Sequence, residues 1–188
     1  SGGRGQYGHC IVKIEPQPMN KGFEFINDVK QGRIPREYIP AVRKGIAACC
    51  ERGGKTGFPF VQVTAELFDG KFHAVDSSEM AFQEAARIAF DEAIARGVTI
   101  LEPIMRIAVQ MPTDHMGDII GSLNARRAEI ESIEEARGNF SQVKGRVPLA
   151  EMTAGRGTYS MEPLTYAPVP ESIAETVVKE ALIRREKK

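Results

Sequence analysis

The chain has 188 residues, of which 42% are hydrophobic and 27% charged, a composition typical of globular proteins and long enough for two small domains. Lys and Arg total 25, as do Asp and Glu, so only a local basic patch can meet a nucleic-acid partner. No apolar run approaches the roughly 18 residues that a membrane span needs. Cys10, Cys49 and Cys50 form no CxxC pair. We therefore expect a soluble protein of a reduced, cytoplasmic compartment, with no membrane partner.

The first part of the chain predicts a strand, an undecided segment and a helix. Residues 9–15 are β-branched and partly alternating, which favours a strand, and two prolines follow it. Residues 22–29 lack a clean period and fit either a short strand or a turn. Residues 40–52 suit a helix, because proline is favoured in the first turn, and the two glycines that follow would end it.

A β-hairpin is predicted between residues 60 and 75. Residues 60–68 alternate between apolar and polar side chains, as a strand with one buried face does. Asp69 and Gly70 are typical of a two-residue turn, and residues 71–75 then supply the second strand.

The clearest helix covers residues 77–96. Asp76 and Glu79 have the spacing of a capping box, in which the Asp76 carboxylate accepts from free amides of the first turn. Apolar residues then recur at helical spacing, and Gly97 ends the pattern.

A domain boundary is predicted at Glu102 and Pro103, since proline is poorly tolerated inside a central strand. Beyond it, residues 104–111 predict a strand, and Thr113 is a candidate N-cap of a helix. The apolar stripe of that helix is formed by Met116, Ile119, Ile120 and Leu123.

The rest of the chain completes most of a split βαβ, or ferredoxin-like, pattern. Three further strands are expected, at residues 129–136, 141–147 and 158–166. The pattern needs a second helix after Leu149, but the stretch around Thr153 is shorter than the roughly eight residues of a usual helix. Residues 170–188 predict a final helix with an apolar stripe at Ile173, Val177 and Ala181.

None of four common catalytic or metal motifs occurs in the sequence. The chain lacks the patterns GxxxxGK[ST], HExxH, GxSxG and CxxC. His9, His73 and His115 lie far apart and have no cysteine partners at ligand spacing. We therefore assign no metal and no catalytic residue.

Two short segments have the residue types that suit contact with RNA. The opening, SGGRGQYG, combines flexible backbone with an arginine, an amide and an aromatic ring, although such ends are more often flexible linkers. The segment from His73 to Ser78 also fits a strand end followed by a helix cap, in which Asp76 already has a role. His73 precedes the cap and has no such structural role in this pattern.

Eight segments resemble translation elongation factor G in their order and spacing. They are SGGRGQYGH, GFEFINDV, IPREYIPAVRKGI, FHAVDSSEMAF, LEPIMRI, MGDIIGSLNARRAEI, VPLAEM and GRGTYSMEP. The resemblance spans nearly the whole chain and implies an α+β class with two domains. Residues 1–102 would correspond to domain IV, whose fold is like the second domain of ribosomal protein S5. Residues 103–188 would be domain V, a ferredoxin-like split βαβ sandwich whose C-terminal helix packs back towards domain IV.

The resemblance also implies a partner, the ribosome. In that family domain IV reaches the decoding centre of the small subunit, where its tip loops meet tRNA and mRNA as they move from the A site to the P site. Domain V lies near the factor-binding site of the large subunit. The site residues implied here are Ser1, Gly2, Gly3, Arg4, Gly5, Gln6, His73, Asp76, Ser77 and Ser78. Their implied role is binding, through donors to phosphate, ribose or base edges.

The sequence departs from the family's pattern in several places. Ala74 replaces the acidic residue common after the tip histidine, which removes a negative charge from that loop. The family's guanine-nucleotide domain, with its GTP and magnesium, is absent from this sequence, so we expect neither GTP hydrolysis nor a cofactor in this chain. The start at Ser1 and the short join at Thr153 are each compatible with a deletion or with residues left out of the chain. We expect a monomer.

Two other functions stay open on the sequence. One is a paralogue specialised for ribosome recycling, and the other is a free-standing RNA-binding protein built from two α+β domains. A phosphate-loop domain encoded before Ser1 would favour a translational GTPase over the free-standing protein.

Overall fold

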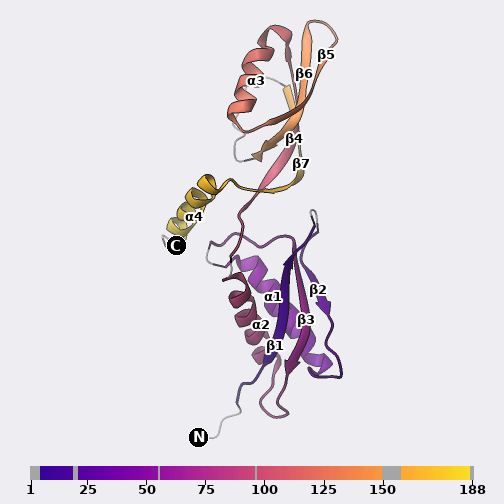
Figure 1. The fold of residues 1–188 in the computed structure, drawn as a ribbon, viewed down its shortest axis with the longest axis vertical. Helices are drawn as coiled ribbons and strands as arrows, with labels where there is room; N and C mark the ends of the chain where they lie inside the picture. Colours follow the sequence, from indigo (N-terminus) through magenta and orange to yellow (C-terminus); the bar gives the residue numbers. More distant parts are fainter. Residues whose placement is uncertain (1–4, 19–20, 55, 96, 150–157, 187–188) are drawn as a thin grey trace. The chain divides into compact units, whose positions relative to one another are not determined.

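The chain divides into two compact units, residues 1–98 with 172–188, called unit 1, and residues 99–171, called unit 2. Each unit has its own β-sheet with helices beside it (Figure 1), which confirms the α+β class. The structure, a computed structural model, describes residues 5–18, 21–54, 56–95, 97–149 and 158–186.

Unit 1 contains a three-stranded sheet with the order β1-β3-β2. Strand β1 (His9–Pro16) pairs antiparallel with β3 (Val63–Lys71), and β2 (Glu24–Asn27) pairs parallel with β3. A parallel pair needs a crossover, which helix α1 (Ile39–Arg52) provides after a short 3-10 helix at Arg36–Tyr38. The strand predicted at the start of the chain is confirmed, and the undecided segment is a strand.

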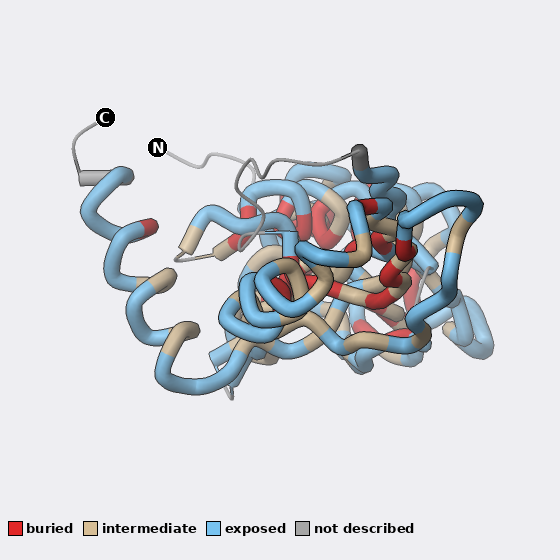
Figure 2. The backbone as a smooth tube through the Cα atoms, turned by 90° about the horizontal axis from the view of Figure 1, so that it is seen from above, coloured by how far each residue is buried: buried red, intermediate tan, exposed pale blue. Residues whose placement is uncertain are grey.

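Helices α1 and α2 (Glu79–Ile94) lie side by side against this sheet (Figure 1). They approach closely at Gly45, where a Cβ atom would lie 2.7 Å from the carbonyl oxygen of Gln83. Apolar side chains of the helices and of β3 fill the space between them and form a core. Buried positions are coloured red along the backbone in Figure 2. Its largest members are Ile34, Val42, Ile46, Leu67, Phe82 and Phe90.

Both predicted helices of unit 1 are confirmed, but one of the predicted caps is wrong. Helix α1 is followed by Gly53 in the left-handed conformation, with φ of 76°. Helix α2 begins after Ser78, whose side chain accepts a hydrogen bond from the backbone N–H of Ala81 at 3.1 Å. The capping box predicted at Asp76 is wrong because Ser78 lies next to the first turn, while the Asp76 carboxylate is engaged elsewhere.

The hairpin predicted at Asp69 and Gly70 is also wrong, since β3 continues through both residues to Lys71. Gly70 is paired with Cys10 of β1, and a Cβ there would lie 2.3 Å from the carbonyl oxygen of His9. The glycine is therefore explained by the close approach of two strands, and no turn is involved. A register shift beside Asp69 marks a β-bulge, which an alternating pattern does not reveal.

Unit 2 is a four-stranded antiparallel sheet with the order β5-β6-β4-β7. Its elements are β4 (Leu101–Pro112), a 3-10 turn (Thr113–His115), α3 (Met116–Ala125), β5 (Glu129–Ala136), β6 (Phe140–Pro148) and β7 (Thr158–Pro168). This order, with β4 and β6 at the centre, is that of a ferredoxin-like sheet and confirms the predicted fold. The stretch around Thr153, which is too short for the second helix of the pattern, falls outside the described residues.

Helix α3 packs on one face of the sheet through the predicted stripe (Figure 1). The core beneath it includes Met105, Ile107, Leu123, Val143 and Val147. The outer face of the same strands is polar, as the alternation of side chains requires.

Two predictions for unit 2 are wrong. Strand β4 is not interrupted at Pro103, because its pairing with β6 begins only at Ile104 and Pro103 has a ladder partner on one side alone. Thr113 does not cap α3, because its hydroxyl lies 3.0 Å from the hydroxyl of Ser141. His115 occupies the N-cap position without a side-chain hydrogen bond.

The final helix, α4 (Glu171–Glu186), is confirmed, and residues 172–188 are grouped with unit 1. Ala181 of the predicted apolar stripe is buried, while Ile173 and Val177 are half-buried. Among the described residues, no helix combines the length and the apolar character that crossing a membrane requires.

Candidate nucleic-acid interface

The structure brings together the described parts of the two segments predicted to form the site. The backbone N–H of Tyr7 donates to the carbonyl oxygen of Asp76 at 2.9 Å, and Tyr7 forms a parallel β-bridge with Ser77. Gly5 and Gln6 therefore lie beside the segment that starts at His73. The predicted site residues Ser1, Gly2, Gly3 and Arg4 fall outside the described residues.

Ser77 is the internal link between these segments. Its side chain is buried, with 8% of the residue exposed. Its hydroxyl donates to the carbonyl oxygen of Tyr7 at 3.0 Å and accepts from the backbone N–H of His73 at 2.9 Å. The Tyr38 hydroxyl adds a donor to the Ser77 carbonyl at 3.5 Å. Ser77 thus organises the site from the inside, where a partner molecule cannot reach it.

Asp76 joins the same segments from the outside. Its Oδ1 accepts from the backbone N–H of Gly5 at 2.9 Å, and its Oδ2 lies 3.1 Å from Nδ1 of His73. A Cβ atom on residue 5 would lie 2.9 Å from Cγ of Asp76, so a larger residue there would displace the Asp76 side chain from its present position. Glycine at position 5 therefore lets the carboxylate approach this backbone N–H closely.

His73 is the most accessible titratable side chain of this cluster, with 56% of its side chain exposed. Its Nδ1 lies 3.1 Å from Oδ2 of Asp76 and 3.2 Å from the backbone nitrogen of Asp76. One ring nitrogen cannot donate to the carboxylate and accept from the amide at the same time, so only one of these two contacts can be a hydrogen bond in a given tautomer of the ring. The ring of Tyr7 meets the His73 ring edge-on, with 6.3 Å between centroids.

Ser78 and Gln6 form a third link. The Ser78 hydroxyl, which caps α2, also donates to Oε1 of Gln6 at 3.2 Å. This contact orients the exposed amide of Gln6 and leaves its Nε2 as a donor for another molecule. Gln6 and His73 thus present polar groups outward from a backbone held by Asp76, Ser77 and Ser78.

Three residues that were not among the predicted site residues also lie at this end of unit 1. Tyr7 bridges the two segments, and His9 is paired with Lys71 in the last step of the β1 and β3 ladder. Both side chains are exposed, and both can carry a positive charge, Lys71 at neutral pH and His9 when protonated. The wrong hairpin assignment concealed this pairing, because it placed Lys71 on a separate strand after a turn.

The exposed groups of the site include the imidazole of His73 and the side-chain amide of Gln6. Groups of these types can donate hydrogen bonds to phosphate, ribose or base edges. The described residues contain no cluster of His, Cys, Asp and Glu with the arrangement of a metal site.

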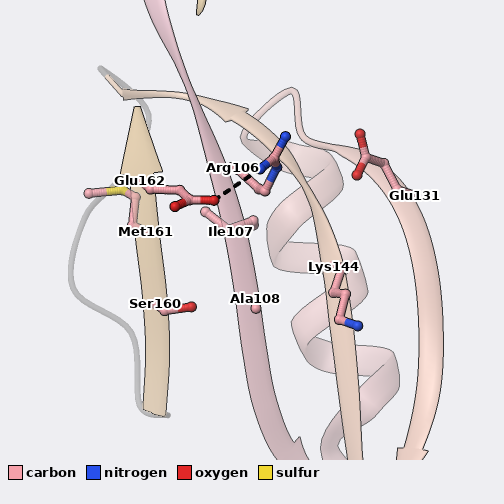
Figure 3. Close-up of a pocket in the computed structure, with 8 residues that line it drawn as sticks. All are labelled: Arg106, Ile107, Ala108, Glu131, Lys144, Ser160, Met161 and Glu162. Carbon is pink, nitrogen blue, oxygen red and sulfur yellow. Dashed lines mark hydrogen bonds and ion pairs between the residues drawn. The ribbon is translucent and has the colours of Figure 1, made fainter. Parts of the chain in front are cut away.

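A separate hollow of about 580 Å³ lies on the sheet of unit 2 (Figure 3). It is lined by Arg106, Ile107, Ala108, Glu131, Lys144, Ser160, Met161 and Glu162. Its basic groups are matched by carboxylates, since Arg106 lies 3.0 Å from Glu162 and Lys144 lies 2.8 Å from Glu134. The hollow therefore offers no excess of positive charge for a nucleic acid.

Comparisons with known proteins cover both units. The family profile of elongation factor G, domain IV, matches residues 1–98, and that of the elongation factor G C-terminus matches residues 99–177. Elongation factor G of Aquifex pyrophilus is 47% identical over 97% of this chain. A crystal structure of a protein from Thermus thermophilus covers 96% of the chain with a TM-score of 0.83 and 36% identity. The chain spans 28% of the length of each of these two proteins. It belongs to the elongation factor G family, of which it carries domain IV and the C-terminal domain.

Proposed function

We propose that this chain is the ribosome-binding part of a translational GTPase that promotes the movement of tRNA and mRNA during elongation. Residues 1–6 and 73–78 form the tip that enters the A site of the decoding centre. The C-terminal domain lies at the factor-binding site of the large subunit. The protein acts as a cytoplasmic monomer, and GTP and magnesium belong to a domain outside this chain.

One observation carries this proposal: the tip segments, 70 positions apart, are joined into one surface by the hydrogen bond from Ser77 to Tyr7. Gln6 and His73 are exposed on that surface, and the basic side chain of Lys71 lies at the same end of the sheet. A surface that must approach RNA closely benefits from glycine backbone and from donors held in place before binding. The arrangement supports a role in positioning RNA.

The sheet of unit 1 explains how such a tip can transmit force. A buried core lies between the sheet and helices α1 and α2, and β1, β3 and α2 all end or begin next to the tip. A rigid element of this kind moves as one body when other domains change shape. We therefore propose a mechanical role for unit 1.

Chemical footprinting of the decoding centre tests the proposal. Gln6→Ala and His73→Ala are made separately in the full-length protein. Each variant is expected to protect A-site nucleotides less than the wild type and to slow translocation. His115→Ala is the matched control, because His115 is an exposed histidine of unit 2. Unchanged protection with both tip variants would overturn the tip assignment.

The same variants separate translocation from ribosome recycling. A translocase loses tRNA movement when the tip is altered, whereas a recycling factor loses subunit splitting. Full-length wild-type protein that splits ribosomes but does not translocate would contradict the proposed function. A protein that binds RNA without either activity would favour the free-standing alternative.

A further inference from the structure

We infer that Asp76 is a positioning residue, which makes the two tip segments act as a single unit and does not itself contact RNA. The inference rests on the proposed function, since it concerns the same tip. It assigns to Asp76 the placing of Gly5 and Gln6, which belong to the other segment.

The contacts of Asp76 are directed to both segments. Its Oδ1 accepts from the N–H of Gly5 at 2.9 Å, its carbonyl oxygen accepts from the N–H of Tyr7 at 2.9 Å, and its Oδ2 lies 3.1 Å from His73. Both carboxylate oxygens thus have partners within the protein. Only 33% of the side chain is exposed, against 56% for His73.

The charge of Asp76 argues against a direct RNA contact. A carboxylate repels phosphate, and it offers no donor while it is ionised. Because residue 74 is alanine, Asp76 is the one acidic side chain between residues 71 and 78. Its carboxylate accepts from the backbone N–H of Gly5 and lies 3.1 Å from Nδ1 of His73.

The other links of the tip limit what Asp76 can do. Ser77 holds the carbonyl oxygen of Tyr7, and the backbone of Asp76 holds the N–H of Tyr7, so Tyr7 keeps its place without the carboxylate. Gly5 is different, because its N–H is held by the carboxylate itself. Loss of that carboxylate should therefore loosen Gly5 and Gln6 selectively.

Three substitutions isolate this role. Asp76→Ala removes both carboxylate contacts, whereas Asp76→Asn keeps an oxygen that can accept from Gly5. Gly5→Ala disturbs the same contact through residue 5, because its Cβ would lie 2.9 Å from Cγ of Asp76. Asp114→Ala is the control, since Asp114 is an exposed aspartate of unit 2.

Amide hydrogen exchange in this chain measures the positioning without a ribosome. Asp76→Ala and Gly5→Ala should each lower the protection of the amide at position 5, relative to its intrinsic exchange rate, by about tenfold or more, the loss expected for a hydrogen bond to a charged group. Asp76→Asn should restore most of the protection. The double variant should be no worse than Asp76→Ala, because removing the carboxylate also removes the clash. Exchange at Ala81, held by Ser78, should stay unchanged in every variant.

Footprinting with the full-length protein gives the second readout. Asp76→Ala should lose the protection that depends on Gln6, and Asp76→Asn should recover most of it. Unchanged exchange at Gly5 in Asp76→Ala would overturn the positioning role. The role would also be overturned if Asp76→Asn lost the protection of A-site nucleotides while amide exchange at Gly5 stayed normal. That result would mean that the charge of Asp76 contacts RNA directly. Faster exchange at Gly5 in Asp76→Ala, with unchanged footprints for Gln6→Ala and His73→Ala, would support the positioning role and refute the proposed function.

Discussion

The guanidinium of Arg127 meets the carboxylate of Glu102 through two hydrogen bonds, of 2.7 Å and 2.9 Å, between the end of α3 and the start of β4. The Glu102 side chain is 9% exposed and that of Arg127 is 29% exposed. Paired in this way, the two charges tolerate burial, but either one alone would be left in a poorly solvated place. Arg127 also has a positive φ of 57°, a left-handed backbone conformation that few residues other than glycine adopt.

Arg127→Ala is expected to destabilise unit 2 by about 3 kcal/mol, because it leaves the Glu102 carboxylate buried without its partner. Urea unfolding followed through signals of unit 2 would measure the change. Arg137→Ala, at an exposed position in the turn between β5 and β6, should change stability by less than about 0.5 kcal/mol. If Glu102→Gln and Arg127→Ala destabilise additively, the two side chains are not coupled.

Gly70→Ala is expected to destabilise unit 1 by about 1–3 kcal/mol, the usual cost of overpacking. The new methyl group would lie 2.3 Å from the carbonyl oxygen of His9 and 2.5 Å from Cδ1 of Ile34. Thermal unfolding of unit 1 provides the measurement. Gly22→Ala is the control, because a Cβ there would meet nothing within 4 Å. If Gly70→Ala left the stability of unit 1 unchanged, β1 and β3 would separate more easily than their pairing indicates.

Gly121→Ala is expected to stabilise unit 2 by about 0.5–1 kcal/mol, since alanine restricts the unfolded chain and is favoured inside helices. Gly121 lies in the middle of α3, where a Cβ would meet nothing within 4 Å. Gly145→Ala in β6 is expected to destabilise unit 2, because its Cβ would lie 2.4 Å from the carbonyl oxygen of Glu129. Denaturant midpoints of the two variants would separate these outcomes.

Burial raises the pKa of the Cys10 and Cys50 thiols from 9.0 to about 11. At neutral pH the native protein should therefore present about 100-fold less thiolate at these positions than an unfolded chain does. Alkylation should be slow in buffer and fast in urea. Rapid labelling of the native protein would contradict this expectation.

The same two thiols make stability depend on pH. Between about pH 9 and pH 11 the unfolded thiols ionise while the folded thiols stay neutral, so the unfolded state binds fewer protons and stability falls as pH rises. Below pH 9 the thiols are neutral in both states and this contribution is fully present. Urea unfolding at pH 8.5 and 10.5 would measure the loss. The difference should shrink in Cys10→Ala, which lacks one of the two groups.

The helices are predictable because their signals are local and repeated. In α2, Phe82 and Phe90 belong to one apolar stripe, and both are fully buried against the sheet. A stripe of this kind indicates both the helix and its buried face. The ferredoxin-like order of unit 2 follows from the same kind of signal, in which strands alternate with one clear helix.

The errors concern residues that have more than one possible physical role. Gly70 suits a turn equally well as a close strand contact, and only the pairing with β1 distinguishes them. Asp76 and Ser78 are both good N-caps, but the Asp76 carboxylate accepts from Gly5, which lies far away in sequence, while Ser78 caps the helix. Pro103 predicts a break, although a strand tolerates proline where one side is unpaired. Each of these roles is decided by a contact between distant residues.

In the candidate site, too, some features are predictable from the sequence and others depend on contacts between distant residues. Residue type and family resemblance indicate Gly5, Gln6 and His73, and the structure places them together. Residue type indicates the aromatic ring of Tyr7 but not its structural role, because that role is carried by backbone hydrogen bonds that any residue type except proline can supply. The sequence therefore indicates exposed polar groups better than the framework that holds them.

The pairing of β1 with β3 has a consequence for synthesis of the protein. Strand β1 is complete at Pro16, but the strand that it joins begins only at Val63, and the link from Tyr7 to Ser77 closes later still. At roughly 5–20 residues per second, a nascent chain would wait several seconds with β1 unpaired. During that interval Ile11, which stays partly exposed even in the folded unit, adds an apolar side chain to an open strand edge. A newly made copy is therefore most open to aggregation, and to capture by chaperones, before residue 78 has left the ribosome that made it.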